Sequence, residues 1–321
     1  MHLTLNKRLA SFIREYPTPA IESDNPFIEG DQPPTLDHHL TISPIDIDID
    51  IDQSLTASPI DIDNDNDIEM SNTGTHDSAA CCTIPTPKSY PDYTPKGTYK
   101  TLANTKTYIV GPPTATKAIF FLYDIFGYKT PTLQGADILA SSGDYLVAMP
   151  DFFDDGTAEV EWLAQDTEEK KEKLGAFLQK IQNTPHYLNR MNESLAALKT
   201  EYPTVERWGA IGYCWAGKIV AVTSGENSPW KVGIQTSPAM LEPEDAKKVT
   251  VPMLVLASKD EPKDKTQAFA EELKVAEKKV EIFESSIHGW MSGRADLEKE
   301  ESKKEYERGY EVALEFLKKH L

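Results

Sequence analysis

The amino-acid sequence predicts an α/β fold in which a mainly parallel central sheet is covered by helices on both faces. From Thr98 onward, short apolar runs alternate with longer segments of helical spacing, the pattern of strands that alternate with helices. The run from Lys117 to Tyr123 is apolar at nearly every position, which is typical of a strand buried on both faces. The chain of 321 residues is long enough for one large domain of this class or two small ones.

The predicted strands cover residues 98–102, 107–110, 117–123, 145–149, 206–212, 232–236, 253–257 and 280–283. Helices are predicted over residues 131–142 and 296–321, and the second carries apolar residues at spacings that would pack it on the sheet. Residues 151–202 are too long for a simple connection between strands. Their Lys and Glu residues fall at helical spacing, so we expect two helices divided at Thr184 and Pro185, the first forming an inserted lid.

The first 78 residues differ in composition from the rest of the chain. They hold 3 Lys or Arg against 16 Asp or Glu, so −13 of the net charge of −19 falls there and about −6 falls on residues 79–321. They are rich in Pro, Ser, Thr, Asn and Asp and have almost no aromatic residues, too little apolar surface to offset the conformational entropy of folding. We predict a disordered, acidic, low-complexity extension over residues 1–78 and one folded domain over residues 79–321.

Charge and cysteine content exclude several classes of protein. The acidic balance argues against nucleic acid as a partner, and no apolar run approaches the length of a membrane span. Cys81 and Cys82 are adjacent, and three cysteines are too few for a disulfide framework and lack the spacing of a zinc site. We therefore expect no metal and a reducing compartment, the cytoplasm, with the mitochondrion as an alternative because Met1 to Arg14 is weakly amphipathic and lacks acidic residues. A monomer or weak oligomer is expected.

The stretch from Gly212 to Lys218 has the pattern of a sharp strand-to-helix turn with Cys214 at its apex. Gly212 and Ala216 stand two residues before and two after the cysteine, where larger side chains would collide as the backbone reverses. A thiol at the start of the following helix lies near the positive end of the helix dipole, which favours the nucleophilic thiolate. The alternative is a buried core cysteine, the common fate of a lone Cys.

Partners for Cys214 are expected at the carboxyl ends of later strands, where open parallel sheets gather their functional groups. Asp260 follows the strand at 253–257, and His288 lies on the loop after the last strand. The order nucleophile, acid, histidine is that of α/β-hydrolase triads, in which the histidine takes the nucleophile's proton and the acid fixes its tautomer. Taken singly, Asp260 could belong to a solvated turn and His288 could be structural. The ordered set predicts acyl transfer.

A site for acyl transfer also needs donors for the oxyanion that develops during attack. The backbone N–H of Trp215, which follows the nucleophile, is one predicted donor. The second is predicted on the loop after the strand that ends at Tyr123, at the N–H of Ile125.

Several motifs together resemble the dienelactone hydrolase family over residues 79–321. They are Gly212 to Lys218, Tyr123 to Gly127, Met149 to Asp154, Asp260, and His288 to Trp290, while Ala80 to Pro85 and Leu133 to Ala140 are similar to its fungal branch. The resemblance implies an α/β-hydrolase fold with a Cys-His-Asp triad, no metal or organic cofactor, and small lactones or esters as substrates.

The resemblance also implies roles for residues around the triad. Asp124 matches the acidic residue that helps to activate the thiol, and it could instead cap the next helix. Arg294 matches the second of two arginines that bind a substrate carboxylate, although its spacing from His288 differs, and the first is missing because no arginine lies between Arg14 and Arg190. Tyr128 and Trp290 are therefore added as candidates for contact with an apolar or aromatic acyl group.

The expected function is hydrolysis of small lactones or carboxylic esters through an acyl-enzyme on Cys214. Two alternatives stay open at this point. One is a thioesterase on the same site, and the other is a non-catalytic interaction protein built on a hydrolase scaffold.

Overall fold

A computed structural model describes residues 93–154 and 156–321 of the chain. The predicted disordered extension at 1–78, Cys81, Cys82 and the motif from Ala80 to Pro85 lie outside the described residues. Within them, strands and helices alternate as the sequence predicts.

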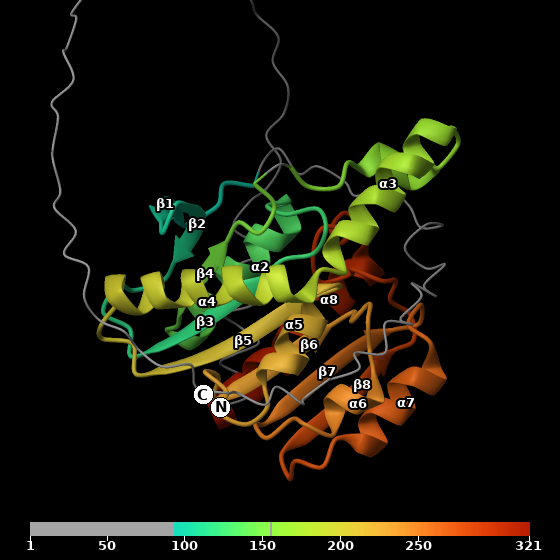
Figure 1. Ribbon diagram of the computed structural model, residues 1–321. Helices are drawn as coiled ribbons and strands as arrows, with labels where there is room; N and C mark the ends of the chain where they lie inside the picture. Colours follow the sequence, from blue (N-terminus) through green and yellow to red (C-terminus); the bar gives the residue numbers. More distant parts are fainter. Residues whose placement is uncertain (1–92, 155) are drawn as a thin grey trace, which may run out of the picture. The chain divides into compact units, whose positions relative to one another are not determined.

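One eight-stranded sheet carries the fold, in the order β1-β2-β4-β3-β5-β6-β7-β8 (Figure 1). β1 and β2 form an antiparallel hairpin at one edge, β2 pairs antiparallel with β4, and the pairs from β4 to β8 are parallel. The strands are β1 (Thr98–Leu102), β2 (Thr105–Val110), β3 (Lys117–Leu122), β4 (Leu146–Pro150), β5 (Arg207–Tyr213), β6 (Val232–Thr236), β7 (Met253–Ser258) and β8 (Lys278–Phe283). The predicted parallel sheet is confirmed.

Helices cover both faces of this sheet (Figure 1). α2 (Thr130–Gly143) and α8 (Glu300–His320) pack against each other on one face, while α4 (Thr184–Glu201) and α5 (Ala216–Thr223) lie on the other. Two shorter helices, α6 (Pro243–Ala246) and α7 (Lys263–Glu272), pack together after β6 and β7. Their short lengths explain why no clear helical period predicted them.

The connection between β4 and β5 contains the inserted segment that the sequence predicts. It consists of a 3₁₀ turn, η2 (Val160–Ala164), and α3 (Glu168–Ile181), followed by α4. Asn183 caps α4 through its side chain, which accepts from the N–H of His186, so the division falls at Thr184 and Pro185 as expected. α3 stands away from the sheet in Figure 1 and buries only Leu174, Phe177 and Ile181 along one side.

The core follows from the apolar central strands. Every residue of β4, β6 and β7 is buried, as are all but the first of β3 and β5, because helices lie on both faces of these strands. The edge strand β1 is exposed at four of its five positions. Its outer backbone edge therefore faces solvent, and polar Thr and Lys side chains accompany it.

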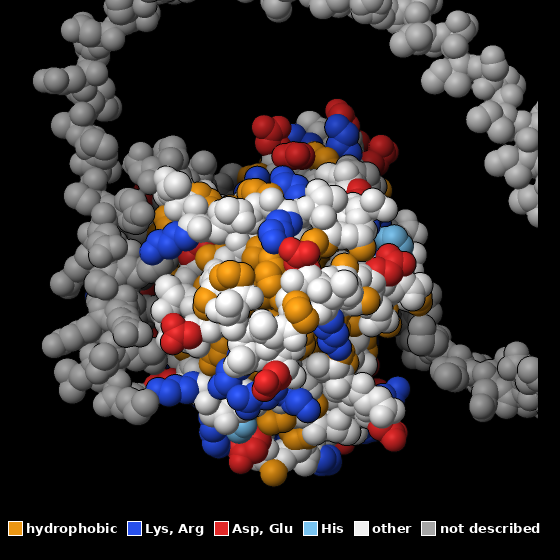
Figure 2. Space-filling model, turned by 90° about the vertical axis from the view of Figure 1, so that its left-hand side faces the viewer, with side chains coloured by type: hydrophobic (Ala, Val, Ile, Leu, Met, Phe, Trp, Pro, Cys, Tyr) orange, Lys and Arg blue, Asp and Glu red, His pale blue; other side chains and the backbone are white. Residues whose placement is uncertain are grey.

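The surface of the described residues is mixed in charge. Figure 2 shows acidic and basic side chains interspersed with apolar and uncharged ones on one face. Among residues 93–154 and 156–321, no helix is long and apolar enough to cross a membrane. In the same part of the chain, no three His, Cys, Asp or Glu side chains are placed to hold a metal ion.

Candidate active site

Cys214 occupies the sharp turn between β5 and α5. Its φ is +58°, in the left-handed region that few residues with a Cβ adopt, and it is almost completely buried. A Cβ on Gly212 would lie 2.4 Å from the carbonyl oxygen of Ala216, so only glycine allows the chain to fold back this closely. The strand–turn–helix predicted from the sequence is therefore present, with the thiol at its apex.

His288 lies on the loop after β8 and is held by two neighbouring acids. Asp260 Oδ2 accepts from the backbone N–H of His288 at 2.8 Å, whereas Nδ1 of the imidazole lies 2.6 Å from Glu261 Oε1. The second oxygen of Glu261 accepts from the backbone N–H of Ser258. The predicted pairing of Asp260 with the imidazole is thus wrong: Asp260 faces the backbone, and the glutamate beside it, one methylene longer, reaches the ring.

Asp124 lies on the loop after β3, buried beside the same site. It accepts from the N–H of Phe126 at 2.9 Å, from the Ser292 hydroxyl at 2.6 Å and from the N–H of Gly293 at 2.9 Å. Burial raises the pKa of the Asp124 carboxyl above its usual range, although these three donors and the nearby His288 act in the opposite direction. Asp124 therefore ties the loop after β3 to the loop that follows His288.

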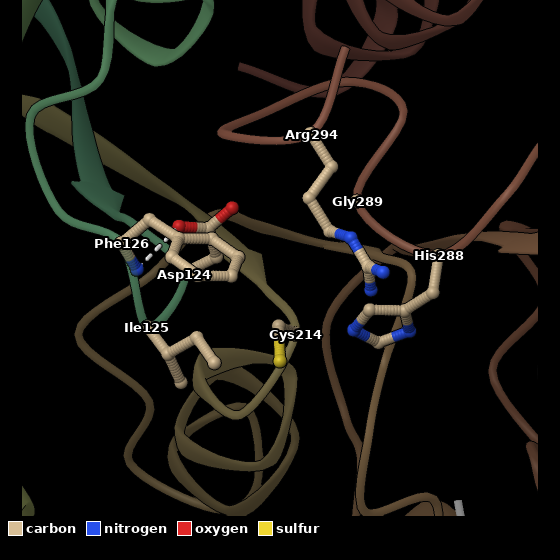
Figure 3. Close-up of a pocket in the computed structure, with 7 residues that line it drawn as sticks. All are labelled: Asp124, Ile125, Phe126, Cys214, His288, Gly289 and Arg294. Carbon is tan, nitrogen blue, oxygen red and sulfur yellow. Dashed lines mark hydrogen bonds between the residues drawn. The ribbon is translucent and has the colours of Figure 1, made fainter. Parts of the chain in front are cut away.

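A small pocket joins these elements (Figure 3). Its lining consists of Asp124, Ile125, Phe126, Cys214, His288, Gly289 and Arg294. It encloses about 240 Å³ between atoms, including its open mouth. The loops after β3, β5 and β8 thus bring together the predicted nucleophile, histidine, acidic residue and one arginine.

Arg294 reaches the pocket along the backbone of the histidine loop. A Cβ on Gly289, whose φ is +84°, would lie 3.1–3.3 Å from three carbons of the Arg294 side chain, so the arginine stem packs on this glycine. The guanidinium end points into the pocket beside the imidazole (Figure 3). Arg294 is 5% exposed, so its charge is largely removed from bulk water.

The two predicted oxyanion donors lie on different elements, Ile125 on the loop after β3 and Trp215 at the start of α5. Ile125 lines the pocket from the loop after β3. Trp215 directly precedes α5 and caps it, and the first N–H groups of a helix have no acceptor within the helix. Both positions are therefore compatible with the predicted role of their backbone N–H groups.

Tyr128 and Trp290, predicted as substrate contacts, are not in the pocket lining. The hydroxyl of Tyr128 donates to Met149 O at 2.9 Å and lies 3.1 Å from Lys106 O, which holds the ring near β2 and β4. Trp290 is buried, and its ring packs against Phe283 with centroids 4.8 Å apart. Their aromatic character reflects packing in this structure.

Sequence reasoning missed Glu261 and Ser292. Glu261 lies beside Asp260 in a polar Lys-Asp-Glu-Pro run that is typical of a solvated turn, yet it is 4% exposed. An acidic residue next to a candidate acid, directly before the proline that starts a helix, was the available signal. No pattern in the sequence distinguished Ser292, because its contact with Asp124 spans 168 residues of the chain.

A buried thiol on a strand-to-helix turn, an imidazole held by a carboxylate and a parallel sheet with helices on both faces define an α/β-hydrolase. Comparison with known proteins supplies the family. The Dienelactone hydrolase family matches residues 105–321, and the chain belongs to this family.

The match to several relatives covers most of each relative's length. Two uncharacterized AIM2 family proteins of Schizosaccharomyces pombe are similar to the chain. One is 29% identical over 225 residues, which cover 68% of this chain and 89% of that protein. The other is 30% identical over 248 residues, which cover 74% of this chain and 98% of that protein. A carboxymethylenebutenolidase homolog of Xenopus tropicalis is 27% identical over 247 residues, 72% of this chain and 93% of its own.

Solved structures share the fold. A protein of Klebsiella pneumoniae assigned as a dienelactone hydrolase has a TM-score of 0.54 at 16% identity, covering 68% of this chain and 97% of that one. A dienelactone hydrolase-like promiscuous phosphotriesterase from metagenomic libraries has a TM-score of 0.50 at 16% identity, covering 70% and 98%. Both confirm the α/β-hydrolase fold, and membership of the family supports a hydrolase.

Proposed function

We propose that this chain hydrolyses small lactones or carboxylic esters by nucleophilic attack of Cys214. The observation that carries the proposal is the shared pocket of Cys214 and His288, with Glu261 Oε1 2.6 Å from Nδ1 of the imidazole. A carboxylate at Nδ1 favours the tautomer with its proton on Nδ1, which makes Nε2 the basic nitrogen on the pocket side.

The reaction would proceed in two halves. In the first, His288 Nε2 takes the thiol proton, the Cys214 sulfur adds to the substrate carbonyl, and the oxyanion accepts hydrogen bonds from the N–H groups of Ile125 and Trp215. The carbon–oxygen bond of the ester then breaks, and Nε2 returns the proton to the leaving alkoxide.

In the second half, water replaces the alcohol. Nε2 takes a proton from the water as its oxygen adds to the acyl carbon, and the tetrahedral intermediate expels the Cys214 thiolate. Nε2 returns its proton to the Cys214 thiolate, and the carboxylic acid leaves. Glu261 stabilises the imidazolium that forms in both halves.

The substrate would be small because the pocket is small and closely lined. Arg294 places a guanidinium in the pocket lining, so an acyl group that carries a carboxylate would gain a charge-assisted hydrogen bond there. Neither Tyr128 nor Trp290 supplies the apolar acyl site considered from the sequence. The proposed substrates are therefore small anionic lactones or esters rather than aromatic ones.

The test is turnover of a panel of p-nitrophenyl esters, small lactones and matched thioesters with the full chain and two variants. Cys214→Ala and His288→Ala should each lower kcat at least about 10³-fold, and wild type should accumulate a Cys214 acyl adduct detectable by mass. Esters with a distal carboxylate should be preferred over their methyl-capped equivalents, and Arg294→Lys should reduce that preference because a lysine cannot form the forked contact. Equal rates in wild type and both triad variants would refute the hydrolytic function.

A further inference from the structure

The short segment after β6 binds the backbone of the nucleophile on both sides. The N–H of Cys214 donates to Thr236 O at 3.0 Å, and the N–H of Ala239 donates to Cys214 O at 3.1 Å. A Cβ on Gly217, in the first turn of α5, would lie 3.0 Å from Pro238. Residues 236–239, here called the β6 bridge, therefore fix the position of the turn that carries the thiol.

The same segment also holds the histidine loop, through one side chain. Ser237 Oγ accepts from the N–H of Gly289, the residue after His288, at 2.9 Å. Ser237 is 1% exposed, and its own N–H donates to Leu256 O at 2.8 Å. The β6 bridge thus contacts Cys214 through its backbone and the base loop through a buried hydroxyl.

The backbone of Ser237 adopts a strained conformation. Its φ is +42°, in the left-handed region that favours glycine, and a non-glycine residue there costs on the order of 1 kcal/mol. Glycine would remove the strain but would also remove the hydroxyl. A strained serine whose hydroxyl accepts a hydrogen bond from the base loop is the pattern expected where the hydroxyl has a function.

The contacts that Asp260, Glu261 and Ser237 make to the histidine loop differ in what they determine. Asp260 and Glu261 hold His288 from the loop after β7. Ser237 belongs to the segment that also binds Cys214, so its hydroxyl links the base and the nucleophile through a single residue. It is therefore placed to influence the distance between Nε2 and the sulfur.

We infer that Ser237 is a positioning residue that holds His288 within proton-transfer distance of Cys214 through the Gly289 N–H. The inference rests on the proposed function, because it assigns to His288 the role of base. Loss of the hydroxyl leaves the Gly289 N–H buried without this acceptor, so the loop moves to find another. Cys214 stays in place, because its backbone N–H and carbonyl bind backbone atoms of Thr236 and Ala239.

Two variants and a matched control test this role. Ser237→Ala and Ser237→Gly both remove the hydroxyl, and the glycine variant also relieves the backbone strain, so it should unfold at a higher urea concentration than Ser237→Ala. The control is Ser224→Ala. Ser224 is also buried, but it caps the end of α5, and its hydroxyl donates to Val220 O of the same helix.

The first readout is alkylation of Cys214 by iodoacetamide as a function of pH, which needs no substrate. Both Ser237 variants should react about 10- to 100-fold more slowly near neutral pH, with the rate rising at higher pH than in wild type, because an imidazole displaced by about 1 Å no longer assists the thiol. Ser224→Ala should keep the wild-type profile even where its urea midpoint is lower. The second readout is ester turnover, in which kcat should fall with KM within about twofold.

The outcomes separate the two proposals. Wild-type alkylation profiles in both Ser237 variants would overturn the positioning role, as would a loss in Ser237→Ala that Ser237→Gly does not share. A shifted profile with no turnover of any ester by wild type would support the positioning role and refute the hydrolytic function. Unchanged profiles with normal ester hydrolysis would refute only the role of Ser237.

Discussion

At the scale of single residues, two adjacent acids bind different parts of one histidine. Asp260 binds the backbone N–H of His288 and Glu261 binds its ring. A carboxylate on the ring selects the tautomer and stabilises the imidazolium, whereas a carboxylate on the backbone only fixes the loop. The two acids therefore predict different kinetic consequences although they are neighbours in the chain.

We expect Glu261→Gln to lower kcat for ester hydrolysis by about 10²- to 10⁴-fold, because an amide at Nδ1 no longer stabilises the imidazolium and permits the wrong tautomer. Asp260→Asn should lower kcat by about tenfold or less, since its amide oxygen still accepts from the His288 N–H. Steady-state kinetics of both variants at one pH, beside wild type, would measure the difference. A larger loss in Asp260→Asn than in Glu261→Gln would contradict this assignment.

The adjacent acids also show where sequence reasoning ends. Asp260, Cys214 and His288 were found because each follows a strand, and the carboxyl ends of parallel strands meet at one edge of the sheet. Which of two neighbouring carboxylates reaches the ring depends on the direction of a side chain within a turn, which no periodicity encodes. The prediction that Tyr128 contacts the substrate is wrong for a related reason, because the Tyr128 hydroxyl donates to backbone carbonyls of β2 and β4.

At the scale of secondary-structure elements, the turn between β5 and α5 depends on close approach at Gly212. A Cβ there would meet the backbone of Ala216 at 2.4–2.7 Å and a methyl of Val220 at 2.8 Å, and the backbone cannot yield as a flexible side chain would. We expect Gly212→Ala to destabilise the fold by about 1–3 kcal/mol and to slow alkylation of Cys214, because the turn must open. Urea unfolding and iodoacetamide kinetics measure the two effects, and an unchanged unfolding midpoint would contradict the steric argument.

The opposite effect is expected at Gly175 in α3. This glycine is exposed, and a Cβ there would meet nothing within 4 Å. Alanine restricts the unfolded chain and favours the helix, so Gly175→Ala should stabilise α3 by about 0.5–1 kcal/mol. Amide hydrogen exchange in α3 should slow in the variant. Exchange as fast as in wild type would indicate that the stability of α3 depends on its packing through Phe177 rather than on helix propensity.

The elements themselves were largely predictable. Strands such as β3 and β7 are apolar runs bounded by turns, and the residues 117–122 and 253–258 could hardly be placed elsewhere. α6 and α7 were not predicted, because a four-residue helix has no period and α7 buries only Thr266 and Phe269. The sequence pattern of a helix reflects which of its side chains are buried, and α6 and α7 bury few side chains.

At the scale of the whole molecule, Asp137 of α2 fastens the segment before β1 and the hairpin to the helix layer. It accepts from the hydroxyl of Tyr108 at 2.6 Å, from the N–H of Lys96 at 2.8 Å and from the hydroxyl of Tyr93. Burial raises the pKa of the Asp137 carboxyl above its ordinary value of 3.8, although these donors act in the opposite direction.

This shift predicts how stability depends on pH. With a raised pKa, the folded state binds the proton more tightly than the unfolded state, so the contribution of Asp137 is full below about pH 3.8 and is lost as pH rises through its folded-state pKa. Asp137→Asn cannot titrate and lacks this slope. The free energy of unfolding of wild type minus that of the variant should therefore fall with rising pH.

Urea unfolding of both proteins at several pH values between about 3.5 and 8 would measure this difference. Subtraction removes the contribution of the other carboxyl groups, because both proteins contain them. A difference that is constant or rises with pH would show that hydrogen bonding, rather than burial, dominates the ionisation of Asp137.

The placement of the proposed nucleophile and base after strands that are not adjacent also has a consequence for synthesis of the chain. Cys214 precedes His288, and ribosomes add roughly 5–20 residues per second, so the 74 residues from 214 to 288 separate the two by about 4–15 s. During this interval the nascent polypeptide carries the thiol without its base, and both acids that hold the base are also added after Cys214. The proposed acyl-transfer activity would therefore be acquired only after the strands flanking β5 have been made.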